Sequence, residues 1–399
     1  MTPATIPVRR GRLALLTIAV VLAAATIRAP LVSVGPVAHT IAHDLQVGAG
    51  VVGLLTTIPV LLFSVSSPLA VWLSRRFGAE FALTLCLAGV VVACLVRSAG
   101  GLGFALAGTA LLGVAITIGN VIIPVIIAHE YPPHRVHLMT AVYTAAINIG
   151  ATTAVVGTAP LAPSLGWQGA LVVWGAFGVA ALAVWAATHG IRATLTPTRP
   201  AAPDPDEPRA PSTLRSSTTW LLVVAFGSQS FGFFAVSAWL PTLLHDHGYP
   251  ATISGDITGV FQLFGAAGAL LVPVAIARAN MVVGVAVCMA CWAVVPIGFL
   301  ITPDLWWLWC VLGGVGQGAG ITLVFSMIVG LGGGQRVVAS RSGAVQGIGY
   351  AIGAVGPTFV GALHDATGAW TVPLLAILLM LVAFTVTGLM AARRLVVLV

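Results

Sequence analysis

The sequence predicts an all-α membrane protein with twelve transmembrane helices, arranged as two six-helix bundles. Three observations predict this class. Of the 399 residues, 59% are hydrophobic and only 7% are charged, a balance that no soluble domain could keep out of aggregates. Twelve apolar windows are long enough to cross a bilayer, and the arginines gather on one side of them. Soluble-enzyme classes are thereby excluded.

The twelve windows divide as six plus six around one long polar segment. They lie near residues 13–38, 48–73, 80–98, 102–129, 136–161, 167–189, 217–244, 252–277, 281–301, 304–330, 337–363 and 369–392. The segment between the two sets is rich in proline, threonine, arginine and acid, which indicates a flexible linker. We therefore expect an N-terminal bundle over residues 1–190, a cytoplasmic linker over 191–216 and a C-terminal bundle over 217–399.

The distribution of arginine predicts the orientation in the membrane. With both termini in the cytoplasm, 15 of the 17 basic residues lie in cytoplasmic segments, leaving Arg97 on the outer side and Arg28 inside a helix. We therefore expect a multi-pass protein of a bacterial plasma membrane. The net charge of +7 does not indicate a nucleic-acid partner, because the arginines are scattered in short loops and form no groove-lining patch.

Landmark residues recur at nearly one offset in the two halves of the chain. The pairs, separated by 201 to 203 residues, are Asp44 and Asp246, Arg75 and Arg278, Arg135 and Arg336, Gly166 and Gly368, and Trp167 and Trp370. Matching loop positions predict that each half has the same up-and-down order, related by a pseudo-two-fold axis along the membrane normal. Two facing bundles imply a central cavity, the architecture of an alternating-access transporter.

Arg28 is the first candidate for a site in this cavity. It lies about 24 Å along its helix beyond Arg12 at ~1.5 Å per residue, inside the ~30 Å apolar core. Arginine keeps its charge in almost any environment, and ionisable groups at such depth usually serve function. The alternative is that Arg28 snorkels outward or satisfies carbonyls of a neighbouring helix. Pro30 and Pro36 follow on the same helix and permit a bend.

Acidic residues are almost absent from the windows. Only Asp256 could enter a helix. At a first helical turn a carboxylate is favoured as a cap, and pairing with Arg28 is the alternative. The natural counter-ion of Arg28 is therefore a ligand. A proton relay of the carboxylate type is not predicted. Facilitated diffusion, exchange or a weak proton linkage through other groups is favoured, and proton coupling stays open.

Further polar side chains lie deep in the windows and are candidates for the same pocket: Asn120, Tyr143, Asn148, Gln229, Gln262, Gln317, Gln346 and Tyr350. Each could equally join helices by hydrogen bonds, so only their number favours a shared pocket. The offset of 202 residues pairs Arg28 with Ser230 and Asn148 with Tyr350. No nucleophile, base or metal-ligand set is assembled, so we expect no cofactor, no metal and no enzymatic activity.

Several short motifs carry a family resemblance over nearly the whole chain. They are Arg28-Ala29-Pro30 with Val34-Gly35-Pro36, Gly119-Asn120 with Pro124, Gly166-Trp167, Trp239-Leu240-Pro241, Gly316-Gln317-Gly318, and Gln346-Gly347-Ile348-Gly349-Tyr350 with Gly356-Pro357. In these the chain resembles the major facilitator superfamily, specifically its cyanate and 2-nitroimidazole transporter family. The resemblance implies transport of small polar or anionic solutes, with Arg28 matching the arginine of the family's first helix.

The superfamily signature between the second and third helices is altered in this chain. Gly78 is kept, but Arg75 stands where an acid is usual, followed by Arg76. The resemblance implies that this segment gates the transporter through an ion pair, in which Glu80 would replace the missing acid. The fifth helix lacks the glycine-proline pattern of many drug/proton antiporters.

We therefore predict a monomeric secondary active or facilitated transporter of a small polar or anionic solute, such as a cyanate-like anion, working by alternating access. Efflux of a neutral nitro-heterocycle such as 2-nitroimidazole, or drug/proton antiport, is the alternative. A binding curve that does not change across the substrate's pKa would favour the neutral cargo. A membrane-embedded enzyme or a sensor is disfavoured, because no catalytic set and no output domain are present.

Overall fold

In the computed structural model, which describes residues 10–47, 49–198, 213–249, 251–332 and 335–398, every regular element is helical. The first half contains α1 (Arg10–Val32), η1 (Gly35–Val37), α2 (Ala38–Asp44), α3 (Ala49–Val65), α4 (Ser67–Phe77), α5 (Ala79–Arg97), α6 (Leu102–Glu130), α7 (Pro133–Val172), α8 (Gly175–His189) and α9 (Ile191–Leu195). The second half contains η2 (Thr213–Arg215), α10 (Ser217–Asp246), α11 (Ala251–Arg278), α12 (Met281–Ile301), η3 (Pro303–Leu305), α13 (Trp306–Gly330), α14 (Gln335–Thr367) and α15 (Thr371–Leu398). The all-α class is confirmed.

The helices account for the twelve predicted windows. Among the described residues, nine helices are long and apolar enough to cross a membrane, or ten when α3 and α4 count as one span bent by 54°. The two remaining windows correspond to α8, which has 15 residues, and to α14, which is long but carries Arg341, Gln346 and His364. The window over 167–189 begins inside α7, because Gly166 has a φ of 68° and breaks that helix.

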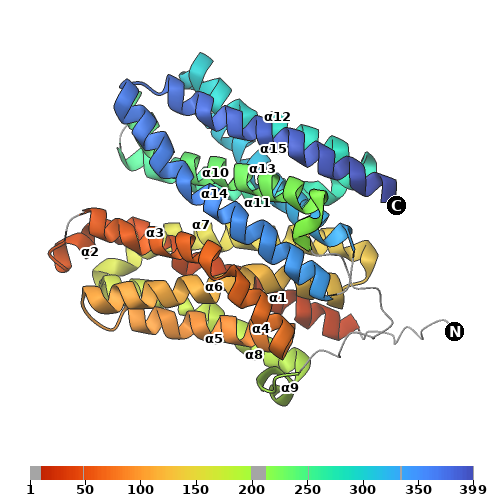
Figure 1. Cartoon of the computed structure of the whole chain (residues 1–399). Coiled ribbons are helices and arrows are strands. Elements are labelled where there is room, and N and C mark those ends of the chain that lie inside the picture. Colours follow the sequence, from red (N-terminus) through yellow and green to blue (C-terminus); the bar gives the residue numbers. More distant parts are fainter. Residues whose placement is uncertain (1–9, 48, 199–212, 250, 333–334, 399) are drawn as a thin grey trace.

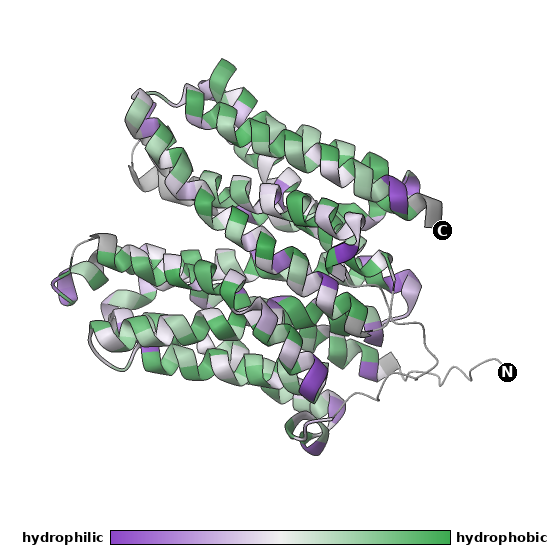
Figure 2. Cartoon of the chain, in the orientation of Figure 1, coloured by the Kyte–Doolittle hydropathy of each residue, from purple (hydrophilic) through white to green (hydrophobic). Residues whose placement is uncertain are grey.

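The outer surface of the molecule is apolar along the helices. Figure 2 shows hydrophobic residues over the helix flanks and hydrophilic residues mainly at the helix ends. Large apolar side chains with high exposure, among them Ile18, Trp72, Phe104, Val287 and Leu379, stand on this surface. So much exposed apolar area is typical of a protein that lies in lipid.

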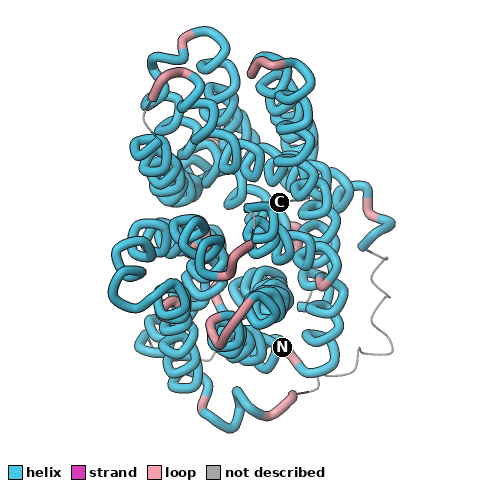
Figure 3. The backbone as a smooth tube through the Cα atoms, turned by 90° about the vertical axis from the view of Figure 1, so that its left-hand side faces the viewer, coloured by secondary structure: helices cyan, strands magenta, loops and turns pink. Residues whose placement is uncertain are grey.

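The two halves of the chain form two groups of helices that face each other. In Figure 1, α10 to α15 lie above α1 to α9, and the end-on view of Figure 3 shows the helix bundles from one end. Helix α7 packs against α11, and α3, α4 and α6 pack against α14. We call the end where α1 begins and α15 ends the termini face, and the opposite end, with α2 and the loop after α10, the far face.

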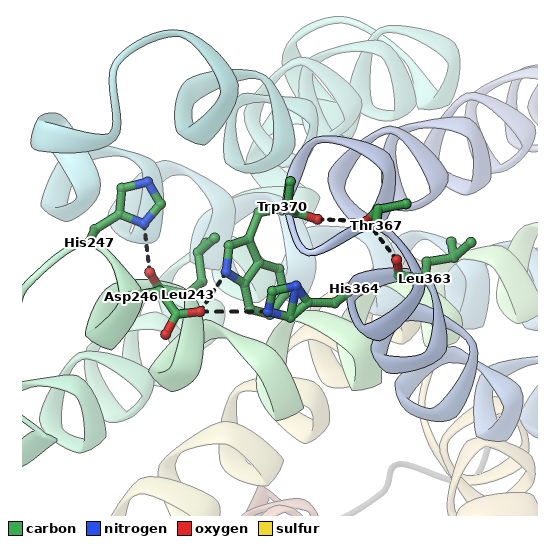
Figure 4. A network of polar contacts seen from close by, with 8 residues as sticks. Leu243, Asp246, His247, Leu363, His364, Thr367 and Trp370 are labelled. Carbon is green, nitrogen blue, oxygen red and sulfur yellow. Dashed lines mark hydrogen bonds and ion pairs between the residues drawn. The ribbon is translucent and has the colours of Figure 1, made fainter.

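The predicted repeat has a structural counterpart at the far face. The carboxylate of Asp44 accepts a hydrogen bond from the indole nitrogen of Trp167 at 2.7 Å. In the second half, Asp246 accepts one from Trp370 at 2.9 Å, as Figure 4 shows. The second contact also includes His364, 3.6 Å from Asp246 and stacked on the Trp370 ring. The paired residues of the sequence therefore form the same Asp–Trp hydrogen bond at the far face of each half.

Candidate functional site

A cavity of about 40 Å³ lies between the two groups of helices, with walls from α1, α6, α7, α10, α13 and α14. Five of the predicted pocket residues line it: Arg28, Asn120, Asn148, Gln317 and Tyr350. Ser230, which the sequence offset pairs with Arg28, lines it too. The two residue pairs given by the internal repeat therefore meet on one cavity wall.

Arg28 presents its guanidinium group to this cavity. The side chain is partly exposed, and its central carbon lies 5.1 Å from the centroid of the Phe233 ring, a cation–π contact. Its Nε atom is buried and makes no hydrogen bond. Among the side chains that the structure describes, which do not include that of Asp256, no carboxylate forms an ion pair with Arg28. The guanidinium therefore keeps donors that an acceptor in the cavity would satisfy.

Aromatic rings, which the sequence did not single out, form much of the remaining wall. Phe226 stacks on Phe325 with centroids 5.8 Å apart and meets Tyr350 edge-on at 5.0 Å. Phe233 and Phe234 complete this group. A phenylalanine in an apolar helix carries no signal by itself, because it fits lipid as well as a cavity. The spacing of Phe226, Ser230 and Phe233 on one helical face was the only available clue.

Side-chain amides join the two halves on one side of the cavity. Gln317 donates to the Asn148 side chain at 3.3 Å, and Gln346 donates to the Asn120 carbonyl at 2.9 Å. Gln346 lies 11 residues into α14 and Arg28 lies 18 residues into α1, and both helices begin at the termini face. At ~1.5 Å per residue the Gln346 bond is therefore nearer that face than Arg28 is. We call these two bonds the amide floor.

The other four predicted pocket residues lie away from the cavity wall. Tyr143 is fully buried behind Phe325, at a centroid distance of 6.0 Å. Gln229 holds three helices together. Its amide nitrogen donates to the Gln317 carbonyl at 2.8 Å, and its oxygen accepts from Trp292 at 2.7 Å.

Gln262 is buried, and its side-chain oxygen has no hydrogen-bond partner. Gln346 belongs to the amide floor and also donates to Ser342 at 2.8 Å. Neither side chain forms part of the cavity wall.

The predicted gating residues lie at the termini face, at the junction of α4 and α5. Arg75 and Arg76 are exposed, and Arg76 lies over the Phe77 ring at 5.8 Å. Gly78 has a φ of 88° and ends α4. Glu80 makes no ion pair with either arginine in the described part of the chain. The described start of the linker packs here, since the Thr198 amide donates to the Phe77 carbonyl at 3.1 Å.

Arg97 lies near the end of the window predicted over 80–98, and its side chain is buried. It is the last residue of α5, its exposure is 0%, and its guanidinium donates to the Pro30 carbonyl at 2.7 Å. The hydropathy pattern gave no sign of this burial, because a charge at the end of an apolar run normally marks the water boundary. Here the side chain turns inward to a carbonyl of α1.

Comparison with known families places this fold among transporters. The family model described as Major Facilitator Superfamily matches residues 14–357. The human organic anion transporter MFSD10 has a similar solved structure, with a TM-score of 0.71, 18% sequence identity and coverage of 95% of this chain and 100% of that one. At this identity the likeness concerns the fold.

Curated bacterial relatives match over most of their length. The uncharacterized transporter YycB of Bacillus subtilis is 33% identical, covering 94% of this chain and 92% of the relative. The 2-nitroimidazole transporter of Escherichia coli is 31% identical, with 94% of each covered. The cyanate transport protein CynX of Escherichia coli is 27% identical, covering 87% of this chain and 89% of the relative.

Proposed function

The chain belongs to the major facilitator superfamily and transports a small solute across the membrane, and we propose that this solute is a small, flat anion of the cyanate type. The proposal depends on one observation. The cavity between the two halves contains the guanidinium of Arg28, which has no carboxylate partner among the side chains that the structure describes. An anion would supply the missing charge and accept the free N–H donors.

The size of the cavity supports a cargo of few atoms. A cavity needs about 10–15 Å³ of free volume to hold one water molecule. The cavity volume of about 40 Å³ therefore suffices for about three waters. A linear triatomic anion matches this space. A nitroimidazole ring, the cargo named for one relative, would require the aromatic wall to move apart. The cyanate-like anion is therefore the favoured substrate.

The wall around Arg28 supports a preference for charge. Phe226, Phe233 and Phe325 are apolar and keep the local dielectric low, where a charge pair is stronger than in water. A bound anion would neutralise Arg28, and this would lower the cost of burying the site in both facing states. Rocking of the two halves about the site would then carry the anion across.

Orientation follows from the arginine distribution. We place the termini face, with Arg75, Arg76, Arg393 and Arg394, in the cytoplasm by the positive-inside rule. By residue count along α14 and α1, the Gln346 bond of the amide floor lies nearer this face than Arg28 does. The position of this bond supports a conformation that is closed toward the cytoplasm. The parts that move in the proposed cycle are the bundles over residues 1–190 and 217–399.

The remaining features of the proposal concern partners and coupling. The cavity walls come from one chain, which supports a monomer as the transporting unit. No carboxylate lines the described cavity, so uniport or exchange is favoured over a carboxylate proton relay. The proposed cycle contains no bond-breaking step and needs no catalyst or cofactor.

The test is uptake of labelled cyanate and of labelled 2-nitroimidazole into proteoliposomes. Replacing Arg28 by Gln removes the charge, and loss of a charge-assisted contact worth about 2 kcal/mol predicts at least about a thirtyfold fall in cyanate uptake at low substrate. Arg28→Lys keeps the charge without the planar fork and should retain part of the activity. Arg192→Gln on exposed α9 is the matched control and should transport like the wild type.

Two results would contradict the proposal. Cyanate uptake by Arg28→Gln equal to that of the wild type would remove the role given to Arg28. If the protein takes up 2-nitroimidazole but not cyanate, and Arg28→Gln does not change that uptake, the transported solute is neutral and not an anion. Monodisperse elution of each variant shows that folding and insertion are intact.

A further inference from the structure

A second arginine is buried in the first half, close to Arg28 along the fold. Arg97 at the end of α5 has 0% exposure, and two of its three side-chain nitrogens, Nε and one terminal nitrogen, are buried without a hydrogen-bond partner. Its other terminal nitrogen donates to the Pro30 carbonyl at 2.7 Å. Pro30 is two residues after Arg28 on α1. No carboxylate forms an ion pair with Arg97 in the part of the chain that the structure describes.

The carbonyl that Arg97 contacts is one that the helix leaves open. Helix α1 ends at Val32, and the chain then turns into the short helix η1. The Ser33 amide still bonds to the Ala29 carbonyl at 3.2 Å, but the Val34 amide makes no such bond to Pro30. The Pro30 carbonyl accepts instead from the Ser33 hydroxyl at 3.1 Å and from Arg97. Carbonyls at a helix C-terminus attract a cation.

Burial of Arg97 works against stability. An arginine taken from water costs more than one hydrogen bond returns unless a counter-charge is present. An apolar side chain of similar length would fill the same space without this cost. Gly108 on α6 lies directly against the Arg97 backbone and leaves no room for a Cβ, so α5 and α6 pack closely where the Arg97 side chain begins. A buried charge that costs stability indicates a function.

We propose that Arg97 is a positioning residue for transport, which ties the broken end of α1 to α5 and so fixes the place of Arg28 in the cavity. The chain of contacts is short: Arg97 bonds to Pro30, and Pro30 is joined to Arg28 through Ala29. When the halves rock, α1 moves with α5 as one body. The effect on substrate rests on the proposed function, while the hold on α1 does not.

The first test measures the hold on α1 without any substrate. Hydrogen exchange of the amides over residues 31–37 is compared in the full-length wild type, Arg97→Met, Arg97→Lys and the exposed control Arg192→Met. Loss of a charge-assisted hydrogen bond predicts about tenfold faster exchange in Arg97→Met. Arg97→Lys should restore slow exchange, and Arg192→Met should match the wild type. Equal exchange in Arg97→Met and the wild type would overturn the proposal.

The second test separates positioning from simple support of the fold. Because the buried charge is costly, we expect the thermal midpoint of Arg97→Met in detergent to equal or exceed that of the wild type. Cyanate uptake should nevertheless show a KM raised about tenfold, largely restored in Arg97→Lys. A lowered midpoint together with an unchanged KM would show a structural role only and would overturn the proposal.

The two proposals fail in different ways. If the wild type takes up neither cyanate nor 2-nitroimidazole, the proposed function fails, while the exchange data still decide whether Arg97 holds α1. If the wild type transports and Arg28→Gln does not, but Arg97→Met exchanges and transports like the wild type, only the positioning role is lost.

Discussion

Buried glutamines in this protein perform different tasks, although they look alike in the sequence. Gln317 presents its amide to the cavity and to Asn148. Gln229 is fully buried and uses both ends of its amide between helices, toward the Gln317 carbonyl and the Trp292 indole. A fully buried side chain whose amide nitrogen and oxygen both bond inside one bundle is not available to a solute in the cavity.

Replacing Gln229 by Leu should therefore lower stability more than affinity. The substitution leaves the buried Trp292 nitrogen without its partner, which costs about 1–3 kcal/mol, and it removes the hydrogen bond to the Gln317 carbonyl. We expect a clear fall in the thermal midpoint in detergent, with the KM for the transported anion within about twofold of the wild type.

Gln262 provides the matched control for this substitution. It is another buried glutamine, and its side-chain oxygen already lacks a partner. Gln262→Leu should change the midpoint little or raise it. A larger loss of stability in Gln262→Leu than in Gln229→Leu would contradict this account of the two amides.

At the scale of helices, close glycine contacts bring the halves together at the termini face. Gly343 and Gly347 on α14 lie against Val71 and Ser67 of α4, with no room for a Cβ. The amide floor lies further in, between α6, α7, α13 and α14. A seam of small residues permits close helix contact, and here it closes one end of the cavity.

A side chain at Gly347 should push α14 away from α4. We predict that Gly347→Leu shifts the population toward a state open at the termini face. The measurement is the distance between spin labels at Arg75 and Val337, in a protein without other cysteines. The distribution should move to longer distances.

Gly53→Ala on α3 is the control, because nothing lies within 4 Å of the position where its Cβ would be. Its label distances should equal those of the parent protein. An unchanged distribution in Gly347→Leu would show that this seam does not close the molecule.

At the scale of the whole molecule, the two halves share a plan but not their charges. Asp44 with Trp167 and Asp246 with Trp370 repeat one corner. In the cavity, Arg28 of the first half faces Ser230 of the second. In the proposed cycle, the repeated arrangement of the two halves permits the rocking motion. The difference between Arg28 and Ser230 at one repeated position gives the cavity its charge.

The orientation of the whole chain can be tested with reporter fusions in bacteria. If the termini face is cytoplasmic, green fluorescent protein at the C-terminus should fluoresce. Alkaline phosphatase inserted after Gly100, between α5 and α6, should be active, and after Pro132, between α6 and α7, inactive. The opposite pattern would reverse the proposed topology.

Most of the fold, and part of the site, could be predicted from the sequence. The windows located the helices, and the repeat predicted that Arg28, Asn148 and Tyr350 line one cavity, as they do. Tyr143, Gln229, Gln262 and Gln346 lie off that wall, and the phenylalanines on it gave no signal. A polar residue between helices and one on a cavity have the same local pattern.

The sequence by itself determined the membrane class, the helices, the repeat and the place of Arg28 along its helix, because hydropathy and charge act along the chain through burial in lipid. Only the tertiary structure decided which amides bond to each other, that Phe233 lies under Arg28, and that Arg97 turns inward to Pro30. Those facts depend on how helices far apart in the chain rotate and pack, and no local pattern specifies that rotation.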